Sequence, residues 1–192
     1  MDTNHAPIPL PTAPRAASLR CLDALAIAGP AGLRTVDPVR LARPLELLLR
    51  VVAAGPAGES AELVLPALWP GADSRRWRVS LATALRTLDA QLGSRGAIAV
   101  DGDRLRVDEA ALRVDSLAFE RALAPLLNPF RMPLPHEREA ARHALAATRG
   151  AEFLPGNESA WAGAARMRIA DAVARAASIL DRPRARGQTP AR

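Results

Sequence analysis

The spacing of hydrophobic residues changes near residue 44, and the change predicts two kinds of element. Ser18 to Ala28 is a short apolar run typical of a strand, Gly29 to Gly32 has the composition of a turn, and Leu33 to Val36 is a second apolar stretch. From Pro44 the apolar residues recur three and four positions apart, which is the spacing of an amphipathic helix, and Gly55 can close its end. We therefore predict a small N-terminal hairpin followed by helices.

A second helix is predicted from Ser60, whose hydroxyl can cap the first turn, to Trp69, where a Trp-Pro-Gly sequence ends it. Pro66 lies inside this stretch, where a proline removes a backbone hydrogen bond and costs about 3 kcal/mol. The helix is therefore either kinked or begins nearer Leu65.

The third helix is the longest of this region. It is predicted to run from Asp73, a good N-terminal cap, to Leu92, with Gly93 at its end. Its apolar stripe stays on one side for five turns and consists of Trp77, Leu81, Ala84, Leu85, Leu88 and Leu92. At about 100° per residue, the opposite side carries Arg75, Arg76, Val79, Ala82, Thr83, Arg86 and Ala90.

A β-hairpin is predicted directly after this helix. Its strands are Ala97 to Val100 and Arg104 to Val107, joined at Asp101-Gly102-Asp103, because Asp-Gly favours a primed turn. Ile98, Val100, Leu105 and Val107 alternate onto one face. An N-terminal hairpin, three helices and a closing wing hairpin within about ninety residues are the pattern of an α+β winged helix.

The rest of the chain is predicted to be helical. Asp115 caps a helix that Pro125 and Asn128-Pro129 terminate, and His136 to Thr148 forms a second. A third is capped by Asn157 or Ser159, and its stripe is Trp161, Ala165, Ala172, Val173, Ala176 and Leu180.

The chain therefore divides into four parts. Residues 1–17 are predicted to be a disordered Pro/Ala-rich leader and residues 182–192 a disordered basic tail, and neither is assigned structure. Between them, residues 18–110 form the winged helix and residues 111–181 an all-α segment.

The net charge of +6 comes mostly from the tail. All 26 basic residues are arginine, against 20 acidic residues, and four of the arginines lie after Asp181 in a stretch without acids. Residues 1–181 therefore carry only +2. The charge supports nucleic-acid binding only where arginines gather in the nearly neutral body.

The inventory of reactive residues argues against an enzyme. The sequence holds no glycine-rich phosphate loop, no cluster of metal ligands and no nucleophile elbow, so we predict no catalytic residue, metal or cofactor. His136 and His143 are seven residues apart and are predicted to be solvated helix residues. Cys21 is the sole cysteine and is predicted to be a buried apolar thiol. Without a secretory signal or a spanning apolar run, the prediction is a cytoplasmic protein with no membrane contact.

Four arginines on the third helix form the main candidate site. Residues 74–86 hold Arg75, Arg76, Arg78 and Arg86 and no acid. Guanidinium groups can contact phosphates or pair with guanine, and a winged helix places this helix in the major groove. Thr83 on the same side, together with Arg104 and Arg106 from the wing strands, completes the predicted DNA contacts.

Two segments then resemble a known family. The stretch LWPGADSRRWRVSLATALRTLDAQLG, followed by AIAVDGDRLRVD, is similar to the OmpR-type winged helix of the Streptomyces antibiotic regulatory protein class of transcriptional activators. The following VDSLAFERAL, TRGAEFLPG and the helix led by Trp161 with Arg166 and Arg168 are similar to the opening of the bacterial transcriptional activation domain. Order and spacing agree over residues 18–180.

The resemblance implies a DNA-binding transcription regulator, with the helix from Asp73 to Leu92 as recognition helix and the hairpin around Asp101 to Arg106 as wing. The helices from Asp115 onward would be a shortened, tetratricopeptide-like module for dimerisation or contact with a regulatory partner. Double-stranded DNA is the predicted ligand, bound by a homodimer or beside a partner.

A second hypothesis belongs to a different class. Val79 and Ala82 are apolar residues where the family usually has polar readers, and Asp101 and Asp103 at the hairpin tip would repel phosphates. The chain could instead be a degenerate winged helix that binds a protein through an apolar surface.

Overall fold

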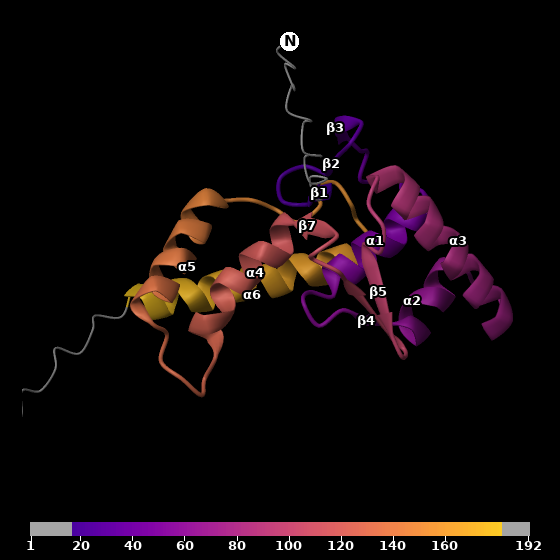
Figure 1. Ribbon diagram of the computed structural model, residues 1–192. Helices are drawn as coiled ribbons and strands as arrows, with labels where there is room; N and C mark the ends of the chain where they lie inside the picture. Colours follow the sequence, from indigo (N-terminus) through magenta and orange to yellow (C-terminus); the bar gives the residue numbers. More distant parts are fainter. Residues whose placement is uncertain (1–16, 182–192) are drawn as a thin grey trace, which may run out of the picture.

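The computed structural model describes residues 17–181, which form six helices and two small β-sheets (Figure 1). The predicted α+β class is confirmed. The predicted tail, and the leader up to residue 16, lie outside the described residues, whereas Ala17 already belongs to the first strand.

The N-terminal sheet differs from the predicted hairpin. The run that we expected to be one strand is split into β1 (Ala17–Arg20) and β2 (Ala26–Gly29), which pair antiparallel, and β3 (Gly32–Thr35) pairs with β2. The chain reverses between β1 and β2, where Asp23 takes a left-handed φ of 67°. The single-strand prediction was wrong because apolar spacing does not reveal a break of this kind.

The fourth strand of this sheet comes from the second half of the chain. Strand β7 (Leu112–Val114) pairs parallel with β1, with Leu19 opposite Val114, and gives the order β3-β2-β1-β7. The prediction of an all-α segment from residue 111 was therefore wrong. Strand β7 completes the N-terminal sheet, and the helical part of the chain begins only at Asp115.

The three predicted helices after the hairpin are present. They are α1 (Arg43–Ala53), α2 (Ala61–Leu68) and α3 (Ser74–Leu92). Helix α1 lies at the centre of the molecule and packs on α3, α6 and β6, so it is buried on most sides (Figure 1). Helix α2 begins directly after Ser60, whose side chain accepts a hydrogen bond from the Glu62 N–H, and it continues through Pro66. The alternative start near Leu65 is excluded.

The predicted hairpin is also present. Strands β5 (Ile98–Asp101) and β6 (Arg104–Val107) pair antiparallel, and the short strand β4 (Glu59–Ser60) adds to β6 in the order β4-β6-β5. The turn between Asp101 and Arg104 has two residues, of which Gly102 has a positive φ of 61°, as a primed turn with glycine first requires.

Three helices complete the described chain: α4 (Asp115–Leu127), α5 (Pro135–Ala147) and α6 (Ala160–Asp181). In Figure 1 they form the arm on the left, with α6 running back toward α1. Helix α4 continues through Pro125 instead of ending there, and Asp115 is its first residue and not its cap. Helix α6 begins directly after Ser159, one of the two predicted caps. None of the helices in the described part of the chain is both long and apolar enough to cross a membrane.

A polar contact joins α6 to α4 and α1. The Arg168 guanidinium forms an ion pair with Glu120, whose side chain is 11% exposed, and donates to the Ala53 carbonyl at 2.9 Å. Two side chains from the second half of the sequence therefore meet a backbone carbonyl from the first half at the end of α1.

Replacing Arg168 with alanine is expected to lower the free energy of unfolding by about 2 kcal/mol, because a nearly buried carboxylate loses its cation and a carbonyl loses a charged donor. Urea unfolding measures the loss. The matched control is Arg175→Ala, which removes an exposed pair with Asp171 on the same helix and is expected to change stability by less than about 0.5 kcal/mol. A loss no larger than that of the control would contradict the prediction.

Candidate nucleic-acid interface

Helix α3 presents one face to the core and one to solvent, as predicted. Ala84, Leu88 and Leu92 are buried, and the other three stripe residues are half-buried. The start of the helix is held by Asp73, whose carboxylate accepts from the Arg76 N–H at 2.8 Å, and its end by Gly93, with φ of 63°. The indole N–H of Trp77 donates to the Trp69 carbonyl at 3.3 Å, so α3 is also fixed to the end of α2.

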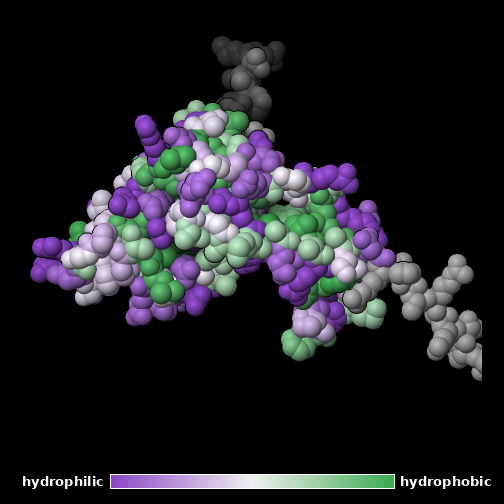
Figure 2. All heavy atoms as spheres, turned by 180° about the vertical axis from the view of Figure 1, so that it is seen from behind, coloured by the Kyte–Doolittle hydropathy of each residue, from purple (hydrophilic) through white to green (hydrophobic). Residues whose placement is uncertain are grey.

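All four predicted arginines of α3 are exposed. Arg75 and Arg86 are eleven residues apart, about three helical turns, and point to the same side. Arg76 and Arg78 flank that side on opposite edges. Seen from behind, the edge of the molecule formed by α3 is on the left, and its outermost part is hydrophilic (Figure 2).

These arginines have no acidic partner among residues 17–181. Each of the nine ion pairs in this part of the chain joins other arginines to acids. Arg78 donates to the Ser74 carbonyl at 3.3 Å and Arg86 to the Thr83 hydroxyl at 3.4 Å, contacts that leave the positive charge unneutralised. Four cations are thus held on one helix, available to an anionic ligand.

The hairpin arginines are in a different situation. Arg106 pairs with Asp101 across the hairpin at 2.6 Å, and Arg104 donates to the carbonyls of Ala57 and Gly58 at 3.4 Å. Both side chains are on the outer face, because the register places Arg106 opposite Ala99 and Arg104 opposite Asp101. Asp101 therefore neutralises Arg106, which makes Arg106 a weaker candidate than the arginines of α3. The repulsion of phosphates by the acidic tip stays a prediction.

The middle of the α3 face is apolar. Val79 is 63% exposed and Ala82 is also exposed, between the arginine positions. Val79 and Thr83 border a hollow of about 260 Å³ that α1 closes with Arg43 and Pro44. Arg43 is a basic residue beside the face that the sequence analysis did not include. The sequence gives little sign that Arg43 lies beside this face, because its proximity to α3 depends on how α1 packs on α3.

The remaining predictions concern groups away from this face. Cys21 is fully buried, as predicted, and burial together with the nearby Asp115 carboxylate raises the pKa of its thiol well above the ordinary value. His136 and His143 are both exposed on α5, also as predicted. Within the described ranges, no three His, Cys, Asp or Glu side chains gather in a way that could hold a metal ion.

Comparison with known proteins adds no assignment. No protein-family model matches the chain, and no curated protein matches its sequence. The functional class of the protein must therefore be inferred from the exposed face of α3 and the elements around it.

Proposed function

We propose that residues 18–110 form a winged helix that binds double-stranded DNA, and that the chain is a cytoplasmic transcription regulator rather than an enzyme. The observation that carries this proposal is the face of α3 with four exposed arginines and no acidic partner within residues 17–181. The order of α1, α2, α3 and the β5–β6 hairpin, with α3 exposed along one side, supports it. In this arrangement α3 enters the major groove and the hairpin lies beside the phosphate backbone.

Each element has a distinct part in the proposed complex. Arg75 and Arg76, in the first turn of α3, are placed for base edges or phosphates, and Arg78, Thr83 and Arg86 extend the contact along the helix. Arg104 contributes from the outer hairpin face. The helices from Asp115 onward serve dimerisation or contact with a partner, which would add the phosphate contacts that one α3 cannot supply.

The proposal is tested by titrating a labelled mixed-sequence duplex with the purified chain over a series of salt concentrations. Each neutralised phosphate contributes about 0.9 to the slope of log affinity against log salt, so four arginines predict a slope of about −3 to −4 per α3. Fluorescence anisotropy measures both quantities. The absence of binding at low salt would overturn the proposal.

A protein-binding role for the same face is the second candidate, and the exposure of Val79 in its middle favours it. The substitution Val79→Arg separates the two. If α3 binds DNA, an added cation on this face is expected to strengthen mixed-sequence binding and steepen the salt slope by about 0.9. If α3 binds a protein through apolar contact, Val79→Arg would weaken that complex and leave DNA binding absent.

A further inference from the structure

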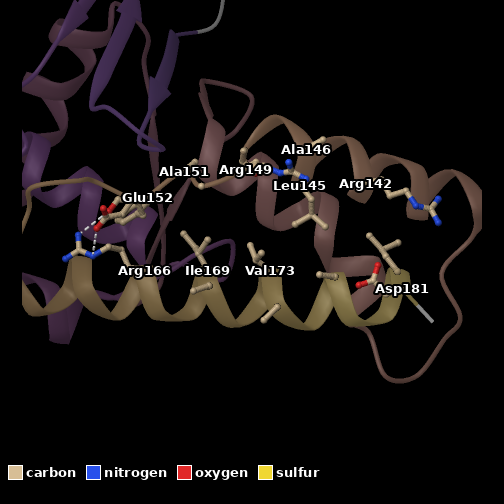
Figure 3. A pocket seen from close by; sticks show the side chains of 17 residues that line it. Arg142, Leu145, Ala146, Arg149, Ala151, Glu152, Arg166, Ile169, Val173 and Asp181 are labelled. Carbon is tan, nitrogen blue, oxygen red and sulfur yellow. Dashed lines mark hydrogen bonds and ion pairs between the residues drawn. The ribbon is translucent and has the colours of Figure 1, made fainter. Parts of the chain in front are cut away.

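A groove of about 780 Å³ lies between α5 and α6, away from α3. Figure 3 shows Leu145 pointing from α5 toward α6, with Ile169 and Val173 pointing up from α6 into the same space. Phe153 and Leu180 also line it. In Figure 2, hydrophobic atoms gather on the arm formed by these helices, between hydrophilic rims. The groove therefore has an apolar floor.

Small side chains on α6 leave the space between the two helices unfilled along the groove. Helix α6 lines it with Ala170, Ala174 and Ala177, and Ala141 is the only fully buried residue of α5. One end of the groove is held by hydrogen bonds between α5 and α6. Arg138 at the start of α5 donates to the carbonyls of Ile179 and Leu180 at 3.3 and 3.5 Å. The groove is preformed, as ligand sites usually are.

The other end is held by the segment after α5. Leu22 forms a β-bridge with Phe153, and the Leu154 N–H donates to the Cys21 carbonyl at 2.8 Å. The wall of the groove formed by Phe153 is thereby joined to the N-terminal sheet. A ligand in the groove would contact a segment that reaches the other half of the molecule.

The arginines around the groove differ in whether an acidic side chain already neutralises them. Arg166 is occupied, since it pairs with Glu152 at 3.2 Å (Figure 3) and also donates to the Phe153 carbonyl. Arg142 pairs with Glu139 at 3.2 Å. Arg149, directly beyond the end of α5, is exposed and takes part in none of the ion pairs of residues 17–181. Asp181 is the acid at the opposite end.

We propose that this groove binds a single-chain amphiphile with a carboxylate head, such as a medium-chain fatty acid. The alkyl chain would lie on the floor formed by Leu145, Ile169 and Val173, and the carboxylate would pair with Arg149. The volume of about 780 Å³ is in the range of small-molecule sites, about 300 to 1,000 Å³. The apolar floor and the single rim arginine that is unpaired within residues 17–181, Arg149, thus favour a small anionic amphiphile.

The test uses the full chain and decanoate as the probe, followed by isothermal titration calorimetry below the concentration at which decanoate forms micelles. Saturable binding of one decanoate per chain is expected, with decanol about tenfold weaker because it cannot pair with Arg149. Arg149→Ala is expected to weaken decanoate about tenfold and to leave decanol unchanged. Absence of saturable binding, or equal loss for both probes, would overturn the proposal.

Two matched alanine substitutions on α6 test the location. Ala174 and Ala164 are both exposed, but only Ala174 lines the groove, so Ala174→Phe fills it and Ala164→Phe does not. We expect Ala174→Phe to lower decanoate affinity at least tenfold and Ala164→Phe to leave it unchanged, with both variants retaining the circular dichroism of the parent chain. Equal effects would place binding elsewhere. If decanoate does not bind and Ala174→Phe instead dissociates an oligomer, the groove is an interface between copies and the proposal fails.

This proposal does not depend on DNA binding. If the chain binds decanoate but no duplex, the groove proposal stands and the proposed DNA-binding function fails. If it binds duplex but no decanoate, the DNA-binding function stands and the groove proposal fails.

Discussion

The double substitution Arg75→Ala with Arg76→Ala is expected to weaken binding of mixed-sequence duplex roughly a hundredfold near physiological salt. A hydrogen bond to a charged group contributes about 1.5 to 3 kcal/mol, and the loss of two such contacts in the first turn of α3 at the lower end of this range, about 3 kcal/mol, corresponds to roughly a hundredfold. The salt slope is expected to become shallower by about 2, since each lost phosphate contact removes about 0.9. Fluorescence anisotropy at several salt concentrations measures both changes.

The result is interpretable because these side chains contribute little to the fold. Both are exposed and lack an ion-pair partner among the described residues, so the free energy of unfolding is expected to change by less than about 0.5 kcal/mol. The matched control removes the same charge elsewhere, by Arg142→Ala with Arg175→Ala, two exposed arginines of α5 and α6. If the control flattens the salt dependence as strongly, binding is a property of overall charge and α3 is not the interface.

Elements with a strong local pattern could be predicted from the sequence. Helix α3 carries its cap, its stripe and its terminal glycine within twenty-one residues, and the β5–β6 hairpin has a two-residue turn, Gly102-Asp103, between strands of alternating apolar residues. Strand β7 could not be predicted in this way. It is three residues long and is a strand only because β1, more than ninety residues earlier, provides its hydrogen-bond partners.

In the candidate site, too, features set by local pattern could be predicted and features set by packing between elements could not. The periodicity of α3 alone places Arg75 and Arg86 on the solvent side, and the structure confirms that exposure. Neutralisation of Arg106 by Asp101 depends on the hairpin register, and the proximity of Arg43 depends on helix packing. The groove between α5 and α6 has no sequence signature, since alanine-rich helices are more often tightly packed than separated.

The largest loss of stability is expected from replacing Asp115, the first residue of α4. Its carboxylate accepts hydrogen bonds from the backbone N–H groups of Cys21 and Leu22, at 2.8 and 3.1 Å, and from that of Ser116 at 2.8 Å. These bonds explain why the run from Ser18 to Ala28 is broken, because the two N–H groups after β1 point to a carboxylate instead of a neighbouring strand. One side chain therefore joins the N-terminal sheet to the helical segment.

Asp115→Ala is expected to lower the free energy of unfolding by about 4 kcal/mol. Two buried backbone N–H groups lose their acceptor, at about 1 to 3 kcal/mol each, and the Ser116 N–H at the helix start is left to solvent. Urea denaturation followed by circular dichroism measures the change. Asp108→Ala is the control, since Asp108 is an exposed aspartate that accepts from the Ala110 N–H within its own turn. A loss below about 1 kcal/mol for Asp115→Ala would contradict the role assigned to it.

The pH dependence of stability provides an independent signature of the same carboxyl. Burial raises the pKa of Asp115 in the folded chain, and the hydrogen bonds from Cys21, Leu22 and Ser116 offset only part of that rise. The folded state therefore holds a proton that the unfolded state has already released, over the interval between the two pKa values. Since the native state binds more protons there, the contribution of Asp115 to the free energy of unfolding falls as pH rises through that interval.

Asp115→Asn is expected to remove this pH-dependent contribution. It is also expected to retain part of the stability that Asp115→Ala loses, because the amide oxygen still accepts one of the two N–H groups from the end of β1. Denaturation curves at a series of pH values for both chains measure the difference, and identical pH profiles would show that Asp115 titrates alike in the folded and unfolded states.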